Sequence, residues 1–158
     1  MSFEYLQSDV SIGVSANSNQ LVYFATTTPN EENDSNESDG LVSSNVQFSN
    51  DGGAMYNSIN LILSGNEEGE YIRYTLDSSE PDYTSIFYDN PIQINSTSVV
   101  RAKIFKNNSI SGYSDTRSYL FDSFHNMPYV SIVSDPYNLF DNEYGIYEFG
   151  DDADSAFP

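Results

Sequence analysis

Residues 70–105 decide the fold, and they read EYIRYTLDSSEPDYTSIFYDNPIQINSTSVVRAKIF. Two runs within them, Tyr71–Leu76 and Ser98–Phe105, alternate apolar and polar side chains with a period of two, as half-buried β-strands do. The residues expected to face inward are Ile72, Tyr74 and Leu76 in the first run and Val100, Ala102 and Ile104 in the second. The outer faces take Thr75 and three of the five basic residues, Arg73, Arg101 and Lys103. We therefore expect two strands of one sandwich, separated by a loop rich in Asp, Ser, Pro and Tyr.

The sequence on either side of this stretch carries further short strand signals. They lie at Val46–Phe48, Ile59–Leu63, Ile86–Tyr88, Ile92–Ile94 and Tyr113–Phe121, separated by turn-forming residues. We expect Gly65–Gly69 to form a hairpin-like connection into Tyr71. About seven short strands in roughly 80 residues, without a convincing helical period, favour an all-β fold. The prediction is an immunoglobulin-like antiparallel β-sandwich over 41–122, with extra flanking strands.

Three other segments differ from this central part in composition. Residues 1–29 hold two apolar runs, Asp9–Val14 and Leu21–Ala25, which suit a pair of strands. Residues 30–40, NEENDSNESDG, hold no apolar side chain, and we predict a linker because such a segment cannot offset its ordering entropy. Residues 123–158 contain a strand-like run at Met127–Val133, a turn-rich stretch at Asp135–Asp141 and an acidic end. We interpret them as the truncated start of a further domain.

Composition excludes several classes of partner. The chain has 24 acidic and five basic residues, for a net charge of -19, and lacks the basic patch that phosphate binding needs. We therefore expect no nucleic-acid partner and no insertion into a membrane. Cysteine is absent, so disulfides and cysteine-based zinc sites are excluded. No run is long enough for a transmembrane helix and the N-terminus is not a signal peptide. We expect an extracellular or cell-surface location, with the export signal outside this chain.

Three motifs in the central part carry a family resemblance. IRYTLDSSEP at 72–81, YDNPIQI at 88–94 and VRAKIF at 100–105 resemble the chitobiase/β-hexosaminidase C-terminal domain and the related fibronectin-type-III-associated repeats. This chain departs from the family pattern at Ser78, where that family usually has Gly, within the turn that follows the first of these strands. The resemblance implies a small immunoglobulin-like sandwich without catalytic residues, used as an accessory module in exported bacterial proteins.

The two flanks carry resemblances of their own. DVSIG at 9–13 and VYFATTTP at 22–29 are similar to the last two strands of a bacterial lamin-tail domain, although Val14, Leu21 and Asn30 replace its usual Arg, Trp and Gly. MPYVSI at 127–132, DPYNLFD at 135–141 and GIY at 145–147 resemble the entry segment of CotH-type kinases. The kinase residues of that family come after this segment, so none is carried over to this chain.

Catalytic motifs are scarce. The single histidine, His125, lies between two predicted modules, and a catalytic histidine needs a nucleophile or an acid held near it. There is no glycine-rich phosphate loop and no G-x-S-x-G motif. Counting carboxylates leaves a glycosidase pair open, but the acids lie mainly in turns. We expect no enzymatic activity from this chain.

The tyrosine rings and the acidic loop suggest two kinds of ligand, a sugar and a calcium ion. Exposed rings of Tyr71, Tyr83 and Tyr88, with Tyr113, could stack on a sugar, although tyrosine is also a common strand residue. Oxygen-rich side chains in the loop, Asp77, Glu80, Asp82 and Asp89, suit calcium, which would be the only cofactor. A second calcium hypothesis, at Asp34, Asn36 and Ser38, matches the EF-hand pattern only in part and lacks its glutamate.

The functional prediction combines these points. We expect a non-catalytic immunoglobulin-like spacer or adhesion module of an exported, multidomain bacterial surface protein. Its partners would be neighbouring domains of the same polypeptide or other surface proteins. One alternative is a carbohydrate-binding accessory domain with a polysaccharide partner. The other is a fragment of a CotH-like protein kinase that lacks the catalytic residues.

Overall fold

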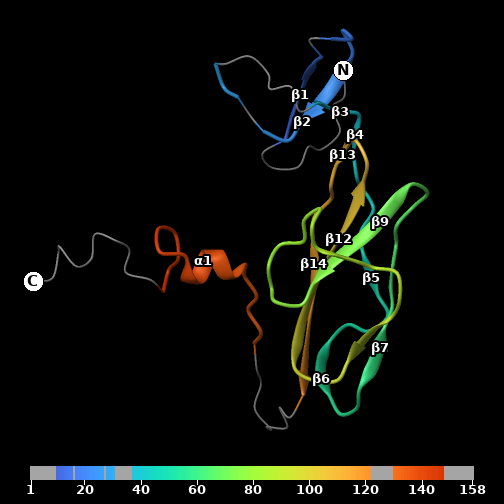
Figure 1. Ribbon diagram of the computed structural model, residues 1–158, viewed down its shortest axis with the longest axis vertical. Coiled ribbons are helices and arrows are strands. Elements are labelled where there is room, and N and C mark those ends of the chain that lie inside the picture. The colour runs from blue at the N-terminus through green and yellow to red at the C-terminus, as the bar shows by residue number, and fades with distance from the viewer. Residues whose placement is uncertain (1–9, 16, 27, 31–36, 122–129, 148–158) are drawn as a thin grey trace, which may run out of the picture.

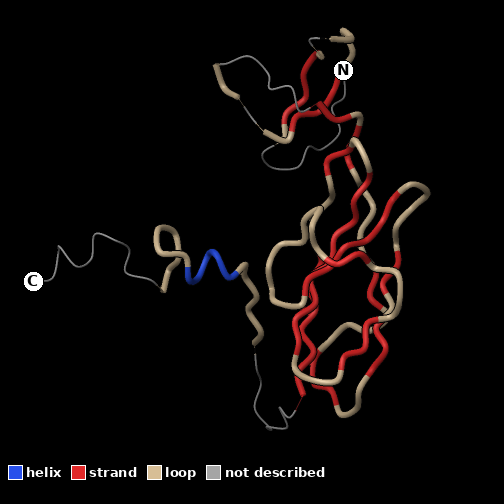
Figure 2. Tube along the Cα trace, viewed as in Figure 1, coloured by secondary structure: helices blue, strands red, loops and turns tan. Residues whose placement is uncertain are grey.

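The central part of the chain forms two layers of β-strands (Figure 1). The computed structural model describes residues 10–15, 17–26, 28–30, 37–121 and 130–147. His125 and the EF-hand-like positions Asp34 and Asn36 lie outside these described residues. Strands dominate the described chain and a single short helix accompanies them (Figure 2), so the all-β prediction is confirmed.

The first layer is a five-stranded sheet with the order β10-β9-β12-β14-β6. Its strands are β10 (Ile86–Phe87), β9 (Glu70–Thr75), β12 (Ser98–Lys106), β14 (Asp115–Phe121) and β6 (Gly53–Met55). The two predicted strands are adjacent and antiparallel, with Ile72 opposite Ile104. Within this sheet one pairing departs from the antiparallel prediction, because β6 runs parallel to β14.

The second layer is built from four shorter strands. β7 (Ile59–Leu61) pairs with β11 (Ile92–Ile94), and β8 (Leu63–Ser64) pairs with β5 (Gln47–Phe48), all antiparallel. Only Ile62 separates β7 from β8, so the two pairs lie one after the other along a single stretch of chain. The expected hairpin at Gly65–Gly69 is wrong, because β8 pairs with β5 and β9 pairs with β10 and β12. That connection crosses from one layer to the other.

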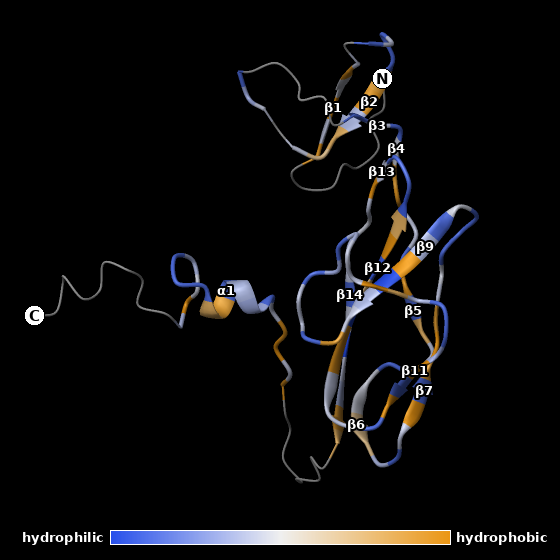
Figure 3. Cartoon of the chain, viewed as in Figure 1, coloured by the Kyte–Doolittle hydropathy of each residue, from blue (hydrophilic) through white to orange (hydrophobic). Residues whose placement is uncertain are grey.

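The core lies between the two layers. The first layer contributes Ile72, Val100, Ala102, Ile104 and Tyr119, and the second contributes Leu61, Leu63, Ile92 and Ile94. Figure 3 shows the matching hydrophobic colouring of β7 and of parts of β12. Leu76, expected to face inward, lies beyond the end of β9 and is exposed. Thr75, expected outside, is buried because the loop after it folds back, and its hydroxyl donates to the Ser79 carbonyl at 2.7 Å.

Tyr119 is the one large polar-tipped side chain in this core that is fully buried. Its hydroxyl donates to the Asn50 carbonyl at 2.9 Å, and burial raises the pKa of Tyr119 to about 12. The turn that carries Asn50 needs a glycine at 52, where φ is +82° and a Cβ atom would lie 2.5 Å from the Ser118 carbonyl oxygen. The tyrosine and the glycine together fix the turn into β6 against β14.

The N-terminal part forms a separate small sheet that leads into the sandwich. β1 (Ser11–Val14) and β2 (Leu21–Phe24) pair antiparallel as predicted, and β3 (Glu37–Ser38) extends that sheet. β4 (Gly40–Leu41) then pairs in parallel with β13 (Ser109–Ile110). Residues 37, 38 and 40 of the predicted linker 30–40 thus take part in strand pairing, which supplies hydrogen bonds that the composition does not indicate.

The C-terminal described segment, 130–147, differs from its prediction. Residues 130–133, the described part of the expected strand Met127–Val133, form no strand. The expected turns at Asp135–Asp141 contain a five-residue helix, α1 (Pro136–Phe140), with Asp135 as its N-cap and Pro136 in its first turn. An acidic cap before a proline is a standard helix start, and it outweighs the lack of a helical period in so short an element. Within the described chain, no helix is long and apolar enough to cross a membrane.

Candidate functional site

The outer face of β10, β9 and β12 carries a row of aromatic rings. Tyr71 stacks on Phe87 with ring centroids 5.8 Å apart and on Phe105 at 6.0 Å. Tyr83, in the loop after β9, lies against Phe105 at 4.9 Å. Because β10 and β12 flank β9 on opposite sides, the two faces of the Tyr71 ring are covered by its neighbours. Phe105 is the buried member of this row.

Exposure within the row is concentrated at its two ends. Tyr83 is 56% exposed and Phe87 is 51% exposed, whereas Tyr71 is half-buried. Burial raises the pKa of Tyr83, and the nearby Tyr71 hydroxyl adds to that increase. Sugar stacking needs an open ring face. Tyr83 and Phe87 keep more open surface for it than Tyr71 does.

Tyr88 belongs to a different environment from the other predicted aromatic residues. Its ring packs edge-on against Tyr74 and contacts the core cluster, and its hydroxyl accepts from the Leu63 backbone N–H at 3.1 Å. Burial, and after it the charge of Asp89 and the neighbouring Tyr88, raises the pKa of Tyr74. Tyr113 is exposed and has no ring contact with the row. The structure thus brings Tyr71 and Tyr83 together around Phe105, and places Tyr88 and Tyr113 elsewhere.

Arg73 lies among the rings. Its guanidinium is 5.6 Å from the Tyr71 centroid and 5.8 Å from the Phe87 centroid, within the range of a cation–π contact. One of its nitrogens, Nη1, donates to the Ser85 carbonyl and so ties β9 to the loop. These contacts fix the side chain in place and cover the rings further.

Two of the loop acids, Asp77 and Asp82, accept hydrogen bonds from residues of the loop itself. Asp77 Oδ1 accepts from the Ser79 backbone N–H and hydroxyl, and these bonds hold the pKa of Asp77 below its usual value. Asp82 Oδ1 accepts from the backbone N–H and hydroxyl groups of both Thr84 and Ser85, which lowers the pKa of Asp82 in the same way. Such turns stabilise a loop without any ligand.

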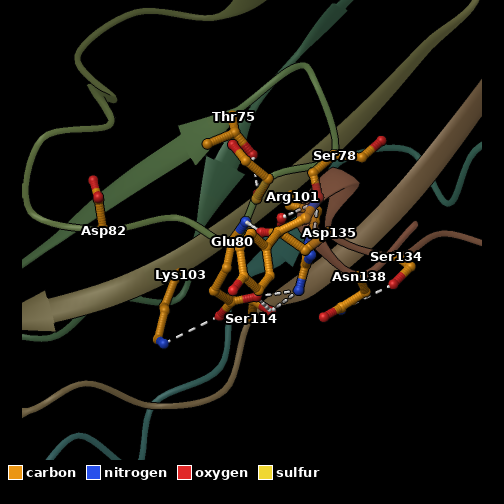
Figure 4. A network of polar contacts seen from close by, with 12 residues as sticks. Thr75, Ser78, Glu80, Asp82, Arg101, Lys103, Ser114, Ser134, Asp135 and Asn138 are labelled. Atoms are coloured by element: carbon orange, nitrogen blue, oxygen red, sulfur yellow. Dashed lines mark hydrogen bonds and ion pairs between the residues drawn. The ribbon is translucent and has the colours of Figure 1, made fainter. Parts of the chain in front are cut away.

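Glu80 is the centre of a polar network on the same face (Figure 4). Its Oε2 accepts from Arg101 Nη2 and from the Ser114 hydroxyl, and its Oε1 accepts from Lys103 Nζ at 3.1 Å. Arg101 also donates to the Ser78 carbonyl at 2.9 Å. The Arg101 and Lys103 side chains are only 15% and 17% exposed, and the Glu80 side chain is 41% exposed. A single carboxylate therefore neutralises two mostly buried cations.

The four predicted calcium ligands are not gathered around one point. Glu80 is engaged by Arg101 and Lys103, and two of the other three, Asp77 and Asp82, cap their own turns. Within the described residues there is no group of three or more His, Cys, Asp or Glu side chains that could hold a metal ion. A cation would have to displace Arg101 and Lys103 to use Glu80, so calcium at this loop stays a prediction that the geometry does not favour.

A pocket of about 420 Å³ opens beside the loop, at the sheet edge where β10 begins. Its walls combine the apolar side chains of Tyr74, Leu76 and Ile86 with hydroxyl and carboxylate groups from Thr75, Asp77, Ser79, Thr84 and Ser85. This volume falls within the range of small-ligand sites. Most of its hydroxyls are already bonded inside the loop. The pocket offers few free donors.

Two residues of this face were not predicted from the sequence. Phe87 lies on a predicted strand but was not a candidate ligand-binding ring, and its position at the sheet edge is a consequence of strand order. Asp135, whose carboxylate accepts from the Glu80 backbone N–H at 2.7 Å, was expected only to form part of a turn. The Asp-Pro pair at 135–136 was an available signal for a helix cap. Nothing in the sequence indicated its contact with the sandwich.

Comparison with known proteins agrees with the family resemblance of the central sandwich. The family model of the chitobiase/β-hexosaminidase C-terminal domain matches residues 50–116, from the turn before β6 to the start of β14. No curated protein and no solved structure gave a match. The matched region does not reach the flanks, so the lamin-tail and CotH resemblances stay predictions. The match assigns an immunoglobulin-like fold to the sandwich and indicates an accessory module of the kind associated with carbohydrate-active enzymes.

Proposed function

We propose that this chain is a non-catalytic immunoglobulin-like spacer or adhesion module of an exported, multidomain surface protein. The proposal rests on the observation that the polar groups on the outer face bond to one another or to their own loop. Glu80, Arg101, Lys103 and Ser114 bond to one another, and Asp82 bonds to its own turn. These groups stabilise the sandwich and its loop, and they are not presented to a substrate.

The way the chain enters the sandwich supports a spacer. β3 pairs with β2, and after one residue β4 pairs with β13, so strand pairing is nearly continuous from the small N-terminal sheet into the sandwich. Backbone hydrogen bonds of this kind limit the freedom of a connection more than an unpaired linker does. The flanking modules, resembling a lamin-tail domain and a CotH-type entry segment, are then the neighbours that the sandwich holds apart at the cell surface.

A domain exchange in the intact surface protein tests this role. Residues 41–121 would be replaced either by an unrelated immunoglobulin-like sandwich of similar length or by a Gly/Ser linker with the same number of residues. A spacer predicts that the foreign sandwich preserves cell adhesion and that the flexible linker reduces it. Loss of adhesion with both replacements would contradict the spacer role, because it would show that this particular surface binds a partner.

The second candidate is a carbohydrate-binding accessory domain, and the exposed ends of the aromatic row favour it. Tyr83 and Phe87 each leave about half of the side chain open beside the pocket-forming loop. A glycan array would show signals that Tyr83→Ala or Phe87→Ala removes, with Tyr113→Ala as the matched control, since Tyr113 is equally exposed and outside the row. An array without signal for the parent chain would exclude this candidate.

The third candidate, a fragment of a CotH-like kinase, has a direct assay. The non-catalytic proposal predicts no ATP-dependent labelling of this chain or of an added protein substrate. The kinase chemistry requires a lysine for the phosphates and acidic or amide ligands for magnesium. Labelling by this chain alone would overturn the non-catalytic assignment.

A further inference from the structure

We infer that the surface around Glu80 is the docking surface for the segment 130–147 and that Asp135 is the residue that positions this segment on the sandwich. The inference rests on the proposed spacer role, because it names how the module fixes the next segment of the chain. The contact joins residues that are 55 positions apart in the sequence. Figure 4 shows Asp135 reaching the network around Glu80 and Arg101.

Asp135 makes a local contact and a long-range contact with different oxygens. Its Oδ1 accepts from the Tyr137 backbone N–H at 2.9 Å and so caps α1, and its carbonyl accepts from the Asn138 N–H at 3.0 Å. Its Oδ2 accepts from the Glu80 backbone N–H at 2.7 Å. One carboxylate therefore links the start of the helix to the loop of the sandwich. Both oxygens are needed, since each accepts from a different backbone donor.

The Glu80 backbone N–H, which donates to Asp135, is held in place by contacts within the sandwich itself. Arg101 and Lys103 hold the Glu80 side chain, Arg101 holds the Ser78 carbonyl, and Thr75 holds the Ser79 carbonyl. The backbone N–H of Glu80 is thus presented by a loop with fixed bonds on both sides. A preorganised donor binds an anionic acceptor at a lower entropic cost than a free loop would.

The segment is attached by polar contacts. A second bond joins the Ser131 and Ser118 hydroxyls at 2.9 Å. None of residues 130–147 is buried. Val133 and Leu139 are partly exposed, and the other large apolar side chains are exposed: Val130, Ile132, Tyr137, Phe140, Tyr144, Ile146 and Tyr147. Apolar burial therefore contributes little to the docked position within the described chain. A few hydrogen bonds set the orientation, and loss of one charge-assisted bond should raise the undocked population by about tenfold.

The absence of cysteine makes a distance measurement straightforward. Spin labels at Glu68→Cys, in the crossing between the layers, and Ile146→Cys, after α1, report the position of the segment by electron–electron resonance. The full chain should give a narrow distance distribution. Asp135→Asn keeps one acceptor oxygen but cannot serve both backbone donors, and Asp135→Ala removes both acceptors. We expect both variants to broaden the distribution.

Asp141→Asn is the matched control. Asp141 comes directly after the same helix and its Oδ1 caps Glu143 and Tyr144 within the segment itself. We expect this variant to keep the narrow distribution. Amide exchange gives a second readout: the Glu80 amide should exchange about tenfold faster in Asp135→Ala, while the amides of β9 and β12 keep their protection.

Two outcomes would overturn the inference. A broad distribution in the parent chain would show that the segment is not docked. A narrow distribution in Asp135→Asn with slow Glu80 exchange would show that Asp135 acts on its own helix and not on the sandwich. The domain exchange in the intact protein tests the spacer role separately. If residues 41–121 bind a ligand, both replacements abolish adhesion, while the distances measured here stay unchanged.

Discussion

Removing the charge of Glu80 tests how far one carboxylate stabilises the outer face. Glu80→Gln keeps the size of the side chain but leaves Arg101 and Lys103 without their carboxylate partner. Exposed ion pairs contribute about 0.2–1 kcal/mol each, and this network lies at the upper end because both cations are mostly buried. Adding the weakened bond from Ser114, we expect the free energy of unfolding to fall by about 1–2 kcal/mol.

The net charge of -19 makes a control necessary, because removing any acid relieves general repulsion. Glu68→Gln removes the same charge from an exposed position of the crossing loop. Urea unfolding monitored by tyrosine fluorescence gives both free energies, and the 13 tyrosines with no tryptophan make that signal usable. The loss in Glu80→Gln relative to Glu68→Gln should shrink in concentrated salt, where charge pairs are screened. Equal stability of the two variants would refute the assignment of Glu80 as the centre of the network.

Four further predictions concern the turns, the core and the calcium question. Ser78 adopts a positive φ of 71°, so Ser78→Gly should stabilise the chain by up to about 1 kcal/mol in urea unfolding, and a loss of stability would contradict the strain. Gly52→Ala places a Cβ atom against the Ser118 carbonyl and should lower the melting temperature clearly, whereas Gly69→Ala, which meets no close atom but has a φ of +80°, should cost less. The lowered pKa values of Asp77 and Asp82 stabilise the fold above about pH 4, and this stability is lost as the pH falls below that value. The raised pKa of Tyr119 contributes about 2–3 kcal/mol to the free energy of unfolding. This contribution is present below about pH 10 and is lost as the pH rises through about 12. Urea midpoints across pH should show both losses of stability. Tyr119→Phe should reduce the alkaline loss, to which the raised pKa values of Tyr74 and Tyr83 also contribute. Calcium should leave the melting temperature unchanged, and a shift with calcium but not with magnesium would restore the loop site.

The strands at the centre of the sandwich were predictable because their side chains obey a simple period. Ile72, Val100, Ala102 and Ile104 alternate with polar residues and all lie in the core. Two of the family motifs fall on β9 with its loop and on β12, the third reaches β11 of the second layer, and the matched residues 50–116 include all three. Ser78, which stands where the family usually has glycine, takes a positive φ, a region that glycine occupies without steric cost.

The errors lie where long-range pairing overrides local pattern. Residues 37–40 of the predicted linker are too polar to indicate strands, yet backbone groups among them pair with β2 and β13. Gly65–Gly69 has the composition of a hairpin, but the strands it joins pair with other partners, which no local signal reveals. Strand order is a property of the assembled layers, and it also decided which tyrosines meet.

At the candidate site, too, the residue types were predictable from the sequence and their contacts were not. Tyr71 and Tyr83 were chosen by residue type and both pack against Phe105, but the rings that cover Tyr71 come from β10 and β12. The acids of the loop were chosen as oxygen ligands, and counting could not show that Glu80 faces two cations from β12. A contact such as that of Asp135 with Glu80 depends on where a distant segment lies, which the sequence does not encode in any short pattern.

The central claim is that residues 41–121 act as one mechanically cooperative spacer, and pulling on a single molecule tests it most directly. Cysteines at Leu41 and Phe121 would provide the two attachment points in a chain that has none of its own. The account predicts one cooperative unfolding step. An extended chain of roughly 3.5 Å per residue spans about 28 nm between the two points, and the gain in length is that value minus their distance in the folded sandwich. Gradual extension without a step, or several steps of unrelated length, would contradict it.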